Sequence, residues 1–144
     1  MRRHLAWPAL VLAALPAFAG GCQKRQIENL SKPDYNLGLQ HGFWDASRAE
    51  LRKDQPNLDP LRSVYRFLNG RSLSSVERHY EGTNKQQVME QLQLLQRRYE
   101  SEVLPLLDTA SPKVRLKPGV TITQVRNAFT AIEPEYDKLR GMTR

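Results

Sequence analysis

The chain has 144 residues, and its 22 Lys and Arg outnumber 15 Asp and Glu to give a formal net charge of +7. This length holds one domain with a modest core, and the single cysteine, Cys22, excludes an internal disulfide framework. The basic residues are spread along the chain, which favours acidic partners such as phospholipid headgroups, lipopolysaccharide or wall polymers.

Residues 1–21 are predicted to be a signal peptide. Arg2 and Arg3 precede an uncharged, mostly apolar run over residues 5–19, and small residues follow. That order is typical of secretory leaders. The run is shorter than the roughly 20 apolar residues of a membrane-spanning helix, and two prolines interrupt it. We therefore expect an exported protein, for which nucleic acid is not an expected partner.

The end of this leader resembles the lipobox of bacterial lipoproteins. Gly20, Gly21 and Cys22 match its small-small-Cys pattern, although Ala19 stands where leucine is usual. The resemblance implies cleavage before Cys22 and lipidation of its thiol, which would explain an unpaired cysteine in an exported chain. By the same resemblance, Gln23 after the cysteine, in place of aspartate, favours the outer membrane over the inner membrane.

Two alternatives to lipidation remain open. Residues 17–19 also fit the A-x-A rule of ordinary signal peptidase, and cleavage after Ala19 would give a secreted protein. The leader could also persist as an uncleaved anchor. With lipidation, three acyl chains would hold the protein firmly, because each buried methylene contributes about 0.8 kcal/mol. Residues 22–34 would then be the lipidated cysteine and its tether, and residues 35–144 a single helical domain.

The domain is expected to open with a helix that starts near Phe43 and ends before Gln55. Trp44 is predicted to be the main aromatic anchor of the N-terminal half. The next helix has a cap at Asp59, and Gly70 is predicted to end it. Its apolar face is formed by Leu61, Val64, Tyr65 and Leu68, with Arg62 and Arg66 turned toward solvent.

Two capping boxes follow. Residues 74–77 predict a short helix that runs to about Glu81, and residues 83–86 predict the start of another, with a sharp turn at Gly82. The helix over residues 84–107 is expected to be the longest element, and Pro105 should bend or break its last turn. Its apolar stripe recurs at steps of three and four: Val88, Leu92, Leu95, Tyr99, Val103 and Leu106.

A basic segment lies between the long helix and the last one. Lys113, Arg115 and Lys117 alternate with two apolar residues, which predicts a short extended strand or an exposed loop over residues 113–117. These three cations are the sequence's candidate contact for an anionic partner, and the alternative is a solvated connector.

Thr121 or Thr123 is predicted to cap the last helix. Pro134 is expected to kink this helix or to start a new turn, and Gly141 to end it. Its expected face comprises Val125, Ala128, Phe129, Ile132, Tyr136 and Leu139. The fold class is therefore all-α, a small bundle of four to six helices around the helix at about 84–107.

The sequence shows no catalytic constellation. Beyond the leader only His41 and His79 remain as histidines, and neither belongs to a zinc-binding motif. No metal or cofactor is expected. The favoured function is a lipid-anchored envelope protein of binding or structural type, facing the periplasm, that engages an envelope protein or an anionic polymer. Two alternatives are an enzyme acting on cell wall or lipid, and binding of an anionic membrane surface through residues 113–117.

Overall fold

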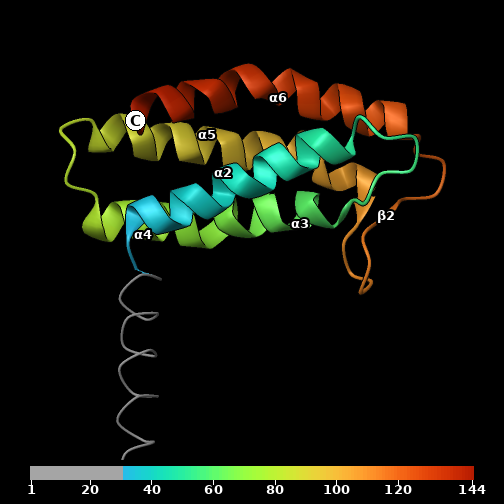
Figure 1. Cartoon of the computed structure of the whole chain (residues 1–144), viewed down its shortest axis with the longest axis horizontal. Helices are drawn as coiled ribbons and strands as arrows, with labels where there is room; N and C mark the ends of the chain where they lie inside the picture. Colours follow the sequence, from blue (N-terminus) through green and yellow to red (C-terminus); the bar gives the residue numbers. More distant parts are fainter. Residues whose placement is uncertain (1–30) are drawn as a thin grey trace, which may run out of the picture.

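The computed structural model describes residues 31–144, so the signal peptide, Cys22 and most of the expected tether lie outside the described residues. Four helical stretches form an all-α bundle, as predicted (Figure 1). The elements are α2 (Pro33–Glu50), α3 (Asp59–Arg66), the π-helical turn η1 (Phe67–Arg71), α4 (Ser72–His79), α5 (Lys85–Glu102), the 3-10 turn η2 (Leu104–Leu106), the strands β1 (Leu107–Asp108) and β2 (Arg115–Leu116), and α6 (Ile122–Met142).

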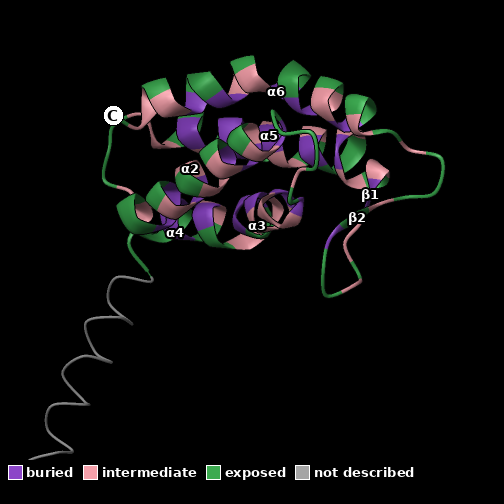
Figure 2. Ribbon diagram, turned by 45° about the vertical axis from the view of Figure 1, so that its right-hand side comes forward, coloured by how far each residue is buried: buried purple, intermediate pink, exposed green. Residues whose placement is uncertain are grey.

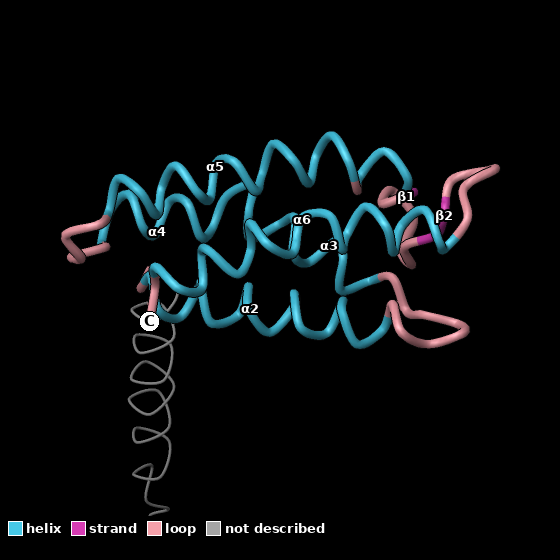
Figure 3. The backbone as a smooth tube through the Cα atoms, turned by 90° about the horizontal axis from the view of Figure 1, so that it is seen from above, coloured by secondary structure: helices cyan, strands magenta, loops and turns pink. Residues whose placement is uncertain are grey.

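The helical stretches run antiparallel in chain order, and their connections gather at two ends of the bundle (Figure 3). One end carries the β1–β2 hairpin and the loop from α2 to α3. The other end carries the beginning of α2, the turn from α4 to α5, and the C-terminus (Figure 1). Within residues 31–144, no helix is both long enough and apolar enough to cross a membrane.

The buried faces of all the helices turn inward onto one continuous core (Figure 2). Trp44 is fully buried at its centre, which confirms it as an aromatic anchor. Tyr99 from α5 and Tyr136 and Phe129 from α6 are the other large, fully buried rings. The predicted stripe of α5 is buried from Val88 to Val103, so that periodicity correctly identified the core face.

Helix α2 begins about ten residues earlier than the sequence indicated, and two residues before the expected domain boundary at 35. Its core-facing positions include Asn36, Gln40 and Ser47, all of them buried. Because three polar residues stand in the inward stripe, the apolar periodicity of this helix is hidden. Pro33 and Asp34 in the first turn are favourable for a helix start.

The predicted break at Gly70 is wrong. The chain continues from α3 through η1 into α4, and Arg71, before the expected second helix, has helical φ and ψ angles. Gly119 is the glycine with a positive φ, 80°, among the described residues, so Gly70 does not form a left-handed stop. The capping box at residues 74–77 is therefore absent, and the helix ends at His79 instead of Glu81.

The turn at Gly82 is confirmed, but the capping box predicted at residues 83–86 is wrong. The N-cap position of α5 is Asn84 and not Thr83, and its side chain does not cap the helix. Its amide nitrogen donates to the carbonyl of Met142, at 2.9 Å, and its amide oxygen accepts from the Tyr80 hydroxyl, at 2.8 Å. Asn84 therefore ties this turn to the C-terminal end of α6.

Helix α5 ends at Glu102, about five residues before the expected end at 107, and a 3-10 turn that contains Pro105 follows, so the predicted break near this proline is confirmed. With 18 residues it is shorter than α6, which has 21 and is the longest helix described. Thr121, one of the two predicted caps, caps α6, and it forms a full capping box with Gln124. The helix is continuous through Pro134, and it ends at Met142, one residue after the predicted end at Gly141.

Candidate functional site

A groove lined by cationic side chains lies on the outer side of α3, η1 and α4. Its volume is about 480 Å³. Three arginines and a histidine supply its polar lining, together with two serines of α4, Gly70 and Ser31 before α2. The lining residues are Ser31, Arg66, Gly70, Arg71, Ser74, Ser75, Arg78 and His79. We call this feature the cationic groove.

A second hollow continues the cationic groove toward the beginning of α2. The two share Ser31, Arg78 and His79, and the second adds Lys32 and one acid, Glu81. The cationic groove therefore lies where the chain enters the bundle, at the end opposite the β1–β2 hairpin (Figure 1).

The π-helical turn explains how the arginines share one side of the helix. The backbone N–H of Ser72 donates to the carbonyl of Phe67, five residues earlier. In an α-helix, residues five apart point about 140° away from one another. The wider π turn brings Arg71 round to the side of Arg66, and both line the groove. Single π turns within α-helices occur frequently at functional sites.

The guanidinium groups of the groove have no acidic partner among residues 31–144. Arg71 lies over the Phe67 ring, with its guanidinium carbon 5.5 Å from the ring centroid. Five other arginines donate to carboxylate or carbonyl oxygens: Arg48, Arg62, Arg98, Arg126 and Arg140. The groove therefore presents positive charge that the fold leaves available to a ligand.

This arrangement is suited to an anion with several oxygen atoms. A guanidinium group offers a planar fork of N–H donors that matches carboxylate and phosphate oxygens in pairs. Gly70 contributes no side chain to the lining, and a Cβ placed there would meet no atom within 4 Å. A groove of this volume accommodates a small molecule or a lipid headgroup.

No protein-family model matches this chain, and neither the curated proteins nor the solved structures give a match. Residue chemistry and geometry therefore carry the functional argument.

The basic segment predicted at residues 113–117 forms one side of the β1–β2 hairpin. Leu107 pairs with Leu116 and Asp108 with Arg115 in antiparallel register. Lys113, Arg115 and Lys117 are all exposed, while Val114 is buried, as the alternation predicted. The structure does not bring these three cations to a described hollow or to the cationic groove.

Arg62 was expected to face solvent, and the structure shows a different role. Its guanidinium donates to the carbonyl oxygens of Ser111 and Pro112, at 2.9 Å each. Asp59, at the start of the same helix, accepts from the backbone N–H of Val114 at 2.8 Å. These two side chains fasten the hairpin to α3.

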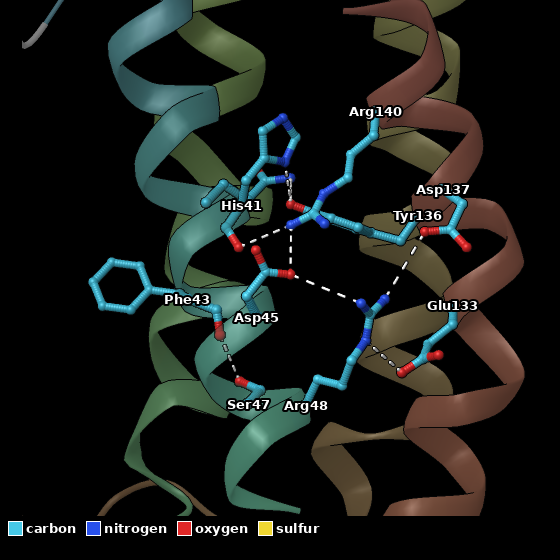
Figure 4. A network of polar contacts seen from close by, with 10 residues as sticks. His41, Phe43, Asp45, Ser47, Arg48, Glu133, Tyr136, Asp137 and Arg140 are labelled. Carbon is cyan, nitrogen blue, oxygen red and sulfur yellow. Dashed lines mark hydrogen bonds and ion pairs between the residues drawn. The ribbon is translucent and has the colours of Figure 1, made fainter. Parts of the chain in front are cut away.

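A polar network between α2 and α6 is another cluster of titratable groups (Figure 4). The Tyr136 hydroxyl lies 2.7 Å from His41 Nδ1 and accepts from Gln40 at 3.4 Å. Arg140 donates to Asp45 at 2.7 Å and to the carbonyl of His41 at 3.1 Å. Further along the same interface, Arg48 forms a salt bridge with Glu133, with 3.1 Å between Arg48 Nε and Glu133 Oε1.

The protonation states in this network favour a structural role. Burial, and then the positive charge of Arg140, lower the pKa of His41 from 6.5 to about 4. Burial raises the pKa of Tyr136 far above its ordinary value. At neutral pH both side chains are therefore uncharged, and His41 Nδ1 and the Tyr136 hydroxyl share a hydrogen bond whose direction is set by the histidine tautomer. None of the described hollows includes either side chain.

The carboxyl groups described here are all at least partly exposed. Hydrogen bonds from Lys53 and Gln91, respectively, lower the pKa values of Glu50 and Glu135. In residues 31–144, no three His, Cys, Asp or Glu side chains are grouped so as to hold a metal ion. Several of the described acids, among them Glu50, Glu133 and Glu135, are partners in salt bridges.

Sequence reasoning missed the cationic groove because its residues were assigned to two separate helices. Arg66 was placed toward solvent, and Arg71 and Arg78 were not considered. Arg71 and Arg78 are two helical turns apart, so the sequence could have placed them on one side of a helix. Nothing in the sequence indicated the π turn that brings Arg66 to the same side.

Proposed function

We propose that this protein is a lipid-anchored component of the bacterial cell envelope that binds an anionic envelope partner in its cationic groove. The single observation that carries the proposal is the row of guanidinium groups that the fold leaves without carboxylate partners. The lipobox-like leader and Cys22 support the proposed lipid anchoring and envelope localisation. Binding is favoured over catalysis because the cationic groove itself is lined by basic and hydroxyl side chains and by Gly70, with no carboxylate among the described lining residues.

The binding part is tested with pyrophosphate and a short polyphosphate as probes, titrated calorimetrically into the protein purified in neutral detergent. The wild type is expected to bind, and more weakly at high salt, because exposed charges are screened beyond about 8 Å at physiological ionic strength. The Arg66→Gln/Arg71→Gln/Arg78→Gln variant should lose at least about tenfold in affinity, since each charge-assisted hydrogen bond contributes about 1.5–3 kcal/mol.

The matched control is Lys113→Gln/Arg115→Gln/Lys117→Gln, which removes the same number of positive charges from the hairpin. Its affinity should stay close to that of the wild type. Equal losses in both variants would reduce the effect to net charge, and a loss in the hairpin variant alone would move the site to residues 113–117. The hairpin is the second candidate site because its three cations are exposed.

The lipid anchoring is tested by measuring the intact mass of the membrane-extracted protein for the wild type and for the Cys22→Ser variant. A wild-type chain that starts at Cys22 and carries acyl groups, absent from the variant, is the expected result. An unmodified chain that starts at Gly20 would make the protein a secreted one, and the anchoring part of the proposal would be wrong.

A further inference from the structure

The position of the cationic groove close to the proposed anchor suggests that the membrane is the source of the anion it binds. The groove and the hollow that continues it are lined by the first described residues, Ser31 and Lys32. Nine peptide units separate Cys22 from Ser31, and a chain of that length spans at most about 30 Å when fully extended. A lipid at Cys22 would therefore keep the groove within that distance of the membrane surface.

The hairpin lies at the opposite end of the bundle (Figure 1). Its cations are thus placed farther along the chain and farther along the molecule from the anchor than those of the groove. Anionic headgroups of the anchoring leaflet would meet Lys32 and Arg78 first, and the negative surface potential of such a leaflet attracts cations only over about one Debye length.

The composition of the groove indicates which headgroup fits. Arg66, Arg71 and Arg78 line it together, and Glu81 is the one acid lining either hollow within the described residues. A phosphodiester headgroup carries one negative charge. A phosphate monoester carries about −1.5 to −2 at pH 7 and three terminal oxygens that accept from several guanidinium forks. The groove is matched to the monoester.

We propose that the cationic groove binds the phosphate monoester of a lipid headgroup in the leaflet that holds the anchor. This inference rests on the proposed function, because it names the anion that the groove would take. It predicts that the protein docks with the beginning of α2 and the outer side of α3–α4 toward the membrane.

The test is native mass spectrometry of the lipidated full-length protein in neutral detergent, titrated with either phosphatidic acid or phosphatidylglycerol. Phosphatidic acid is expected to bind at least about tenfold more tightly, because the monoester engages more guanidinium donors than the diester. Glycerol 3-phosphate serves as the soluble competitor. If it binds as tightly as phosphatidic acid, the groove recognises free phosphate, and the lipid assignment fails while anion binding stands.

Two variants locate the site. Arg66→Gln/Arg71→Gln/Arg78→Gln should lose phosphatidic acid, and the hairpin variant described above should retain it. Equal lipid binding by the wild type and the groove variant would overturn both this inference and the proposed function. Equal affinities for phosphatidic acid and phosphatidylglycerol would overturn the monoester preference.

A third variant, Gly70→Leu, leaves the charge unchanged and places a side chain in the groove. Its folding is protected, because a Cβ at Gly70 meets no neighbour and leucine is a better helix former than glycine. We expect loss of lipid binding with a far-ultraviolet circular dichroism spectrum like that of the wild type. Gly38→Leu, at another glycine whose Cβ would be free of neighbours, is the control and should bind normally.

Discussion

The indole ring of Trp44 on α2 lies parallel to the phenol ring of Tyr136 on α6, with 3.9 Å between ring centroids and 1° between planes. The ring of Phe129 stacks on the same indole at 4.2 Å. All three side chains are buried, so the first and last described helices are joined through one aromatic stack. At its rim, the Tyr136 hydroxyl connects this stack to the polar network of His41.

Replacing Trp44 by alanine should remove the largest single contribution to the core. Large-to-small substitutions of buried aromatic residues cost about 3–5 kcal/mol, through lost transfer free energy and the cavity that remains. We expect a loss of this size in the free energy of unfolding, measured by urea denaturation. Phe43→Ala is the comparison, since Phe43 is only partly buried and contacts Phe67 at the edge of the core. Equal losses in the two variants would contradict the central role of Trp44.

Tyr136→Phe separates the stack from the network. The ring remains, but the substitution leaves Gln40 Nε2 and His41 Nδ1 without the hydroxyl that each contacts. Leaving buried polar groups unpaired costs about 1–3 kcal/mol. Tyr65→Phe is the matched control, because the Tyr65 hydroxyl bonds to Glu100 at the exposed surface. Urea denaturation should show a clearly larger loss for Tyr136→Phe, and a neutral effect would mean that the network contributes nothing to stability.

The pKa of His41 predicts an acid-sensitive fold. The pKa of His41 is about 4 in the folded protein and 6.5 for an unperturbed histidine, which represents the unfolded chain. Between these pH values the unfolded chain therefore binds a proton that the folded chain does not. Stability is therefore highest above pH 6.5 and falls as the pH drops toward 4. We expect the free energy of unfolding to fall by about 1–2 kcal/mol over this range. The full pKa shift would give a larger loss, but His41 is partly exposed and solvent screens its charge.

The measurement is the free energy of unfolding of the wild type and His41→Gln across this pH range. The glutamine side chain does not titrate, so the difference between the two proteins should change with pH and be constant above pH 6.5. A difference independent of pH would show that His41 has the same pKa in both states. Lowered pKa values at Glu50 and Glu135 add a further loss at lower pH, common to both proteins.

The sequence predicted the fold class and most core positions, because apolar residues at steps of three and four are a direct consequence of helical packing. The stripe of α5 and the cap at Thr121 depend on local chemistry and were correct. The start of α2 was not, since Asn36 and Gln40 occupy inward positions whose hydrogen-bond partners come partly from distant residues, as Tyr136 does for Gln40. Local pattern reading has no means of finding a partner 96 residues away.

The candidate site shows the same limit. Glycine commonly terminates helices, which is why a helix end was expected at Gly70. Only the tertiary structure shows that the helix continues through Gly70 as a π turn. That one turn joins two expected helices and places Arg66 beside Arg71. Arg62 was likewise expected in solvent because its carbonyl partners, 49 or 50 residues later, carry no side-chain signal.

Arg62 gives a last prediction about the hairpin. Its guanidinium holds the carbonyl oxygens of Ser111 and Pro112 and so restrains the loop next to Lys113 and Arg115, both exposed to trypsin. Segments with few buried contacts open locally at low free-energy cost. Arg62→Gln removes the fork, and each charge-assisted hydrogen bond contributes about 1.5–3 kcal/mol, so cleavage at these two residues should accelerate by roughly tenfold or more. The measurement is limited trypsinolysis followed by mass spectrometry.

Arg66→Gln is the control for this experiment, because it removes one arginine from the same helix without touching the hairpin. Its cleavage rate at Lys113 and Arg115 should match that of the wild type. If Arg62→Gln also matched the wild type, the backbone pairing of β1 with β2 and the bond from Val114 to Asp59 would suffice to hold the hairpin closed. Acceleration in Arg62→Gln alone would show that the hairpin owes its order to α3, and that its exposed cations are presented on a fastened loop.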